Sequence, residues 1–119
     1  MQGYTDIIRK YAADESHVGL LANPDGTGEV GLDAAERGRR LAVRFTLQVK
    51  DNQVEKALFQ AFGCGYTIAA CSVAAELSEG HSLEDIRKYT PADIEHKLGG
   101  LPEDRAYCAE LASQALQAA

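Results

Sequence analysis

The chain has 119 residues and a formal net charge of −6, with 45% hydrophobic and 25% charged residues. These values are ordinary for a soluble globular protein, and we expect residues 1–119 to form one domain around a single core. The acidic balance argues against nucleic acid as a partner. No apolar run reaches the length of a membrane span and no signal-peptide pattern opens the chain, so we expect no membrane partner.

The cysteine content indicates the compartment. The chain has three cysteines, an odd number that cannot all pair in disulfides. This favours a reducing environment in which thiols are kept for reactivity or packing. We therefore expect a cytoplasmic protein.

The first third of the chain alternates between a helix and turn-forming residues. Residues 2–13 place Tyr4, Ile7, Ile8 and Tyr11 on one face and predict a short amphipathic helix. Residues 12–28 are rich in turn formers, and residues 30–32 favour a short edge strand. We interpret residues 33–40, which are polar and charged, as a solvated loop.

A β-hairpin is the clearest pattern in the sequence. Residues 41–49 alternate between apolar and polar side chains, as expected for a strand with one buried face. Residues 50–53 predict a hairpin turn, and residues 54–62 predict an antiparallel return strand.

The hairpin leads into Gly63-Cys64-Gly65, which is followed by a helix with an apolar stripe that runs to Ser78. The flanking glycines leave the thiol uncovered, and a helix N-terminus favours thiolate over thiol. A reactive cysteine and a tight turn with a buried cysteine remain equally compatible with this local pattern.

Helices fill the rest of the chain. Ser82 and Thr90 predict N-caps of two short helices, the second ending at Gly99-Gly100, and Pro102 is expected to begin the last helix. The expected fold class is α+β, with a small antiparallel sheet of about three strands packed against helices on one side.

The order of these motifs resembles one known family. Gly63-Cys64-Gly65, the Asn23-Pro24 turn, the two preceding strands and Leu101-Pro102 shortly before Cys108 are similar to the NifU/IscU-type iron–sulfur cluster assembly scaffolds. The resemblance covers roughly the whole chain, with extra residues around positions 14–18, and implies an IscU/NifU-like fold.

The resemblance also implies a metal site of three cysteines with an aspartate and a histidine. Cys64 and Cys108 match the family's second and third cysteines, and Gly63 and Gly65 flank Cys64. The family's Cys-Gly-Asp segment falls on Arg39 and Arg40, and Tyr107 replaces its histidine. A cation cannot bind a metal ion, so this chain departs from the family at the site itself.

Two further residues are minor candidates. Cys71 lies two helical turns beyond Cys64, roughly 10 Å along the axis, and core packing is its favoured interpretation. His17 would reach the site only if the N-terminal segment folded back. All three histidines are otherwise expected to be solvated.

The leading hypothesis is a divergent scaffold or carrier for iron–sulfur clusters without turnover of its own. The resemblance implies a cysteine desulfurase as partner, acceptor proteins, and iron and sulfide as cargo, with zinc as an alternative metal. A 2Fe–2S cluster needs about four ligands, so we expect a homodimer to share it through Cys64 and Cys108. The alternatives are a sulfur-relay protein that accepts persulfide and a non-catalytic interaction module.

Overall fold

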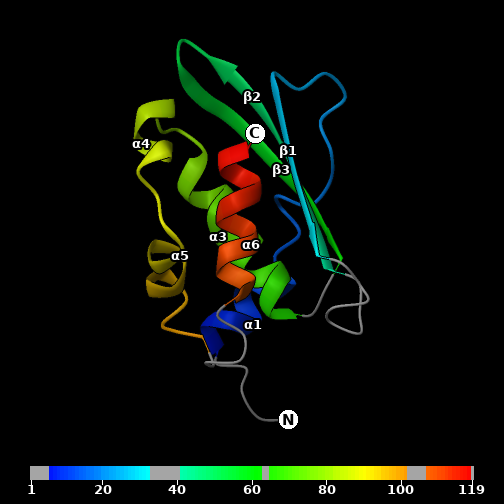
Figure 1. Cartoon of the computed structure of the whole chain (residues 1–119), viewed down its shortest axis with the longest axis vertical. Helices are drawn as coiled ribbons and strands as arrows, with labels where there is room; N and C mark the ends of the chain where they lie inside the picture. Colours follow the sequence, from blue (N-terminus) through cyan, green and yellow to red (C-terminus); the bar gives the residue numbers. More distant parts are fainter. Residues whose placement is uncertain (1–5, 33–40, 63–64, 102–106, 119) are drawn as a thin grey trace.

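The computed structural model describes residues 6–32, 41–62, 65–101 and 107–118 (Figure 1). The expected helix start at Gln2, the loop 33–40 and the helix start at Pro102 therefore lie outside the described residues. The elements are α1 (Asp6–Ala13), β1 (Gly26–Leu32), β2 (Leu41–Lys50), β3 (Gln53–Phe62), α3 (Gly65–Ser78), α4 (Leu83–Arg87), α5 (Pro91–Lys97) and α6 (Tyr107–Ala118).

The sheet has the strand order β1-β2-β3, and both pairs are antiparallel. The hairpin between β2 and β3 is confirmed, with Asp51 and Asn52 at positive φ of 52° and 64°. These values belong to a type I′ turn, whose twist suits a two-residue hairpin loop. Helices α3 and α6 lie against one face of the sheet, which confirms the α+β class (Figure 1).

The prediction of a short edge strand at residues 30–32 is wrong in its length, because strand β1 is longer. It begins at Gly26, because cross-strand pairing with β2 overrides the turn tendency of its glycines. Gly28 is buried opposite Phe45, on the face that α6 covers.

The core is organised around α3, which is buried on nearly all sides. Sheet strand β3 covers one side of this helix, and α1, α5 and α6 cover the others. The sequence predicts a helix with one apolar stripe, whereas ten of its residues are buried. Many of these are small, so the neighbouring elements approach closely. No helix within the described ranges is long and apolar enough to span a membrane.

The short helices begin and end as expected. Ser82 accepts a hydrogen bond from the Asp85 amide at 3.2 Å, and the Thr90 amide donates to Asp93 at 2.7 Å. Gly99 and Gly100 follow α5 with φ of 78° and 103°.

The segment between α1 and β1 has to pass from one edge of the sheet to the other. We call residues 14–21 the strap. The strap forms a parallel bridge to β3 between Val18 and Phe59. It then crosses the face of the sheet away from the helices, where the Leu21 amide donates to Thr46 Oγ1 at 3.1 Å.

Candidate functional site

The first turns of α3 and α6 meet at one end of the molecule. Thr67 Oγ1 lies 3.3 Å from Cys108 Sγ, and both residues are fully buried. The two helices pack against each other along their length. The sequence gives no sign of Thr67 as a neighbour of Cys108, because the two residues are separated by 41 positions.

Cys71 follows Thr67 by one helical turn and belongs to the same contact between α3 and α6. Residues four apart on a helix lie on one face, which places Cys71 next to Thr67 on the side toward Cys108. Burial raises the pKa of the Cys71 thiol far above its usual range, and the neighbouring Cys108 raises this pKa further. Cys71 is therefore a protonated, packed thiol, in agreement with its interpretation as core packing.

Several residues of the predicted site lie outside the described part of the chain. These are Gly63, Cys64, Arg39 and Arg40. Gly65 begins α3, and Tyr107 begins α6 directly before Cys108. The prediction that Cys64 lies close to Cys108 thus remains a prediction. Among the described residues, no group of three or more His, Cys, Asp or Glu side chains is arranged to hold a metal ion.

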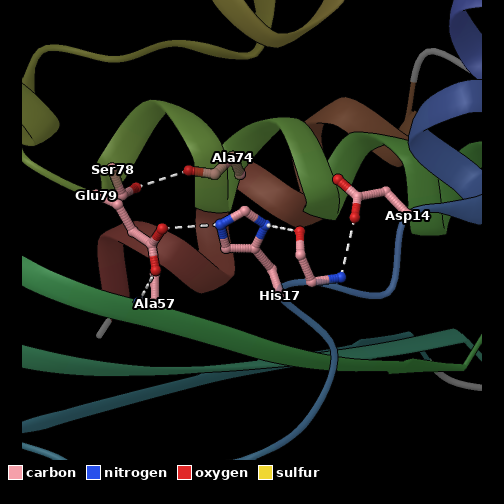
Figure 2. Close-up of polar contacts among 7 residues, drawn as sticks. Asp14, His17, Ala57, Ala74, Ser78 and Glu79 are labelled. Atoms are coloured by element: carbon pink, nitrogen blue, oxygen red, sulfur yellow. Dashed lines mark hydrogen bonds and ion pairs between the residues drawn. The ribbon is translucent and has the colours of Figure 1, made fainter.

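His17 is placed differently from both of its sequence interpretations. Its side chain is only 14% exposed, so it is not solvated. Figure 2 shows the side chain of His17 pointing from the strap toward the end of α3, where Nε2 lies 2.9 Å from Glu79 Oε1. Its Nδ1 lies 3.1 Å from Ser16 Oγ, and the Ser16 amide donates to Asp14 at 2.9 Å.

The bonding of Glu79 fixes the roles of these atoms. A carboxylate only accepts hydrogen bonds, so His17 Nε2 carries the proton. The second oxygen of Glu79 accepts the backbone amide of Ala57 on β3 at 2.9 Å (Figure 2). We call the pair of His17 and Glu79 the latch. A sequence separation of 62 residues hides this pair from any local pattern.

The latch lies far from the start of α3. Glu79 directly follows this helix of 14 residues, which is roughly 20 Å long. The structure therefore does not bring His17 to the end of α3 where Gly65 lies. His81 and His96 are exposed, as expected.

The sequence and the fold agree with one protein family. Residues 3–119 match the family described as NifU-like N terminal domain. The chain belongs to this family, as the resemblance of its motifs predicts.

Particular relatives extend this result. The chain is 34% identical over 116 residues to the iron–sulfur cluster assembly scaffold protein IscU 1 of Archaeoglobus fulgidus, covering 98% of this chain and 73% of the relative. It is 30% identical over 118 residues to the scaffold protein IscU of Aquifex aeolicus, covering 98% and 73%. The crystal structure of a putative iron–sulfur cluster assembly scaffold from Fervidobacterium islandicum has a TM-score of 0.72 at 15% identity, covering 96% and 93%, and is similar in fold.

Proposed function

We propose that this chain is an iron–sulfur cluster assembly scaffold or carrier, in which Cys64 and Cys108 accept sulfur or bind iron. Family membership and the relatives named as scaffold proteins support this function. The structural observation that carries it is the contact of Thr67 with Cys108 at 3.3 Å. Thr67 follows Cys64 by three residues, a length of chain that spans at most about 11 Å. This short connection supports our proposal that Cys64 and Cys108 act on one small cargo.

The number of ligands favours a site shared between two chains. Iron–sulfur clusters and zinc take about four ligands, whereas this chain offers two cysteines at matched positions. Arg39, Arg40 and Tyr107 stand where the family has other site residues. Two copies around a twofold axis supply four thiolates. We propose one 2Fe–2S cluster per homodimer, with iron and sulfide as cargo.

The partners follow from this cargo. A cysteine desulfurase would supply sulfur, and acceptor proteins would receive the assembled cluster. The protein itself would act as a scaffold in the cytoplasm and not as an enzyme.

A sulfur-relay protein is the second candidate, because two thiols suffice for that role. In this reaction the Cys64 thiolate attacks the outer sulfur of the desulfurase persulfide. The sulfur–sulfur bond of the desulfurase breaks, its own thiolate leaves, and Cys64 carries the persulfide. The third possibility is an interaction module that has kept the fold without this chemistry.

Anaerobic reconstitution with iron and sulfide tests the leading proposal. We expect about one cluster per two chains by iron and sulfide analysis, with a dimer by light scattering. Cys64→Ser and Cys108→Ser should each lose the cluster, whereas Cys71→Ala should keep it because Cys71 is a packing residue. A cluster retained when both Cys64 and Cys108 are serine would contradict the proposal.

The alternatives give different results in the same preparation. Incubation with a cysteine desulfurase and cysteine, without iron, should add the mass of sulfur to Cys64 or Cys108. Persulfide formation in a protein that never accumulates a cluster would favour the relay. A variant without both thiols that keeps its partners and its cellular role would favour the interaction module.

A further inference from the structure

The outer edge of β3, which faces away from β2, is hydrogen-bonded along much of its length. Near the hairpin turn, the Val54 amide donates to the His81 carbonyl at 2.9 Å, and the Gly80 amide donates to the Val54 carbonyl at 2.8 Å. The loop after α3 thus covers the first part of this edge.

The latch and the strap cover the next part. Glu79 accepts the Ala57 amide at 2.9 Å. The Phe59 amide donates to the His17 carbonyl at 2.8 Å, and the Gly19 amide donates to the Phe59 carbonyl at 2.8 Å. These are groups that a neighbouring β-strand would otherwise bind.

The strap is held mainly by polar contacts. Its apolar side chains Val18 and Leu20 are 49% and 41% exposed, so little apolar burial fixes it to the sheet. One side chain, Glu79, binds both the strap through His17 and β3 through Ala57. A segment attached by few buried apolar contacts opens more readily than the core.

We propose that the strap is a reversible cover of the outer edge of β3 and that the latch of His17 and Glu79 holds it in place. When the latch is broken, β3 pairs antiparallel with β3 of a second copy of this chain. Two identical edges related by a twofold axis offer each other the same outward amides and carbonyls. The exposed side chains Glu55, Lys56 and Gln60 of β3 carry one negative and one positive charge, so this edge itself has no net charge.

The test compares His17→Ala and Glu79→Ala with the matched control Ser78→Ala. Ser78 precedes Glu79 in the chain, and its hydroxyl donates to the Ala74 carbonyl of the same helix at 2.7 Å (Figure 2). All proteins are kept reduced and free of metal by a chelator, so that a shared cluster plays no part. Hydrogen exchange and light scattering are measured from low to high protein concentration.

At low concentration we expect the Phe59 amide of both latch variants to exchange roughly tenfold faster than in Ser78→Ala, because a hydrogen bond to a charged group is lost. At high concentration both variants should become dimers and regain protection at Phe59, and Glu79→Ala should also regain it at Ala57, while Ser78→Ala stays a monomer. His17→Ala leaves the hydrogen bond from the Ala57 amide to Glu79 in place. This variant alone can test the proposal if Glu79→Ala does not fold. Monomers at every concentration, or Phe59 exchange equal to the control, would overturn the proposal.

Discussion

The two ends of α3 have different chemistry, although they belong to one helix. In its first half, Thr67 and Cys71 lie on the side toward Cys108, and all three residues are fully buried. Directly after its end, Glu79 binds His17 and the Ala57 amide, and the side chains of the latch are 14% and 32% exposed. One end is dry and built from sulfur and hydroxyl groups, whereas the other is polar and only partly buried.

The comparison shows why the residue types alone do not locate a metal site. Both ring nitrogens of His17 and both oxygens of Glu79 have hydrogen-bond partners within the chain. A metal ion would have to displace these partners. Thiols form only weak hydrogen bonds and are ligands for soft metal ions. We therefore propose the end of α3 with fewer hard donors as the place for iron and sulfur.

A carboxylate at the dry end should give the largest effect. We expect Cys71→Asp to lower the free energy of unfolding by about 3 to 5 kcal/mol, because an unpaired charge is buried. Cys71→Ala, the control, should cost about 1 kcal/mol. Urea denaturation measures both, and equal stability of the two variants would show that this end is open to water.

Loss of the latch should have the next largest effect. Glu79→Ala removes the acceptor for both His17 and the Ala57 amide, and we expect a cost of about 2 kcal/mol. Ser78→Ala should cost less, since its hydroxyl bonds only within α3. Thermal and urea unfolding of the two variants measure the difference, and the reverse order would mean that the latch does not stabilise the fold.

Alkaline pH should destabilise the protein through Cys71. Because burial raises the pKa of this thiol in the folded state, its contribution to stability is present below the ordinary thiol pKa and is lost as pH rises. One pH unit above the ordinary value, the loss is about 1.4 kcal/mol. The pKa of Tyr11 is raised to about 12 by burial and by Glu76, so Tyr11 adds to this loss only at higher pH.

The measurement is the slope of unfolding free energy against pH. The slope is measured from just below to just above the ordinary pKa of a cysteine thiol. In this range, Cys71→Ala should have a shallower slope than the unchanged protein. Parallel slopes would show that Cys71 ionises as readily in the folded chain as in the unfolded one.

The smallest effect should come from a pair on the exposed face of the sheet. Arg44 and Glu29 lie opposite each other on β2 and β1, and their side chains are 44% and 56% exposed. A double-mutant cycle should give a coupling energy of about 0.5 kcal/mol or less. The same cycle on His17 and Glu79 should give a larger value, because that pair is less exposed. Equal coupling would remove the distinction between the latch and a surface ion pair.

Local patterns predict most of the fold. The alternation of residues 41–49 and the caps at Ser82 and Thr90 depend on nearby residues, and the structure confirms these elements. The start of β1 at Gly26 depends instead on pairing with β2, a strand more distant in sequence. Patterns of single residues do not contain that information, which explains why the predicted strand is too short.

The candidate site depends still more on distant contacts. Its cysteines could be selected from motifs and resemblance, but the approach of Thr67 to Cys108 is decided by the packing of α3 on α6. The i, i+4 spacing of Thr67 and Cys71 is a signal that both face the same neighbour. For His17, no comparable spacing exists, because its partner belongs to an element 62 residues away.

The burial of α3 on nearly all sides has a consequence for the newly made chain. This helix needs α6 as one of its covers, and α6 is formed by residues 107–118. While the ribosome is still adding those residues, Cys71 lacks the cover that α6 supplies in the folded protein. We therefore expect an oxidant present during synthesis to modify Cys71 faster than the same oxidant added to the folded protein.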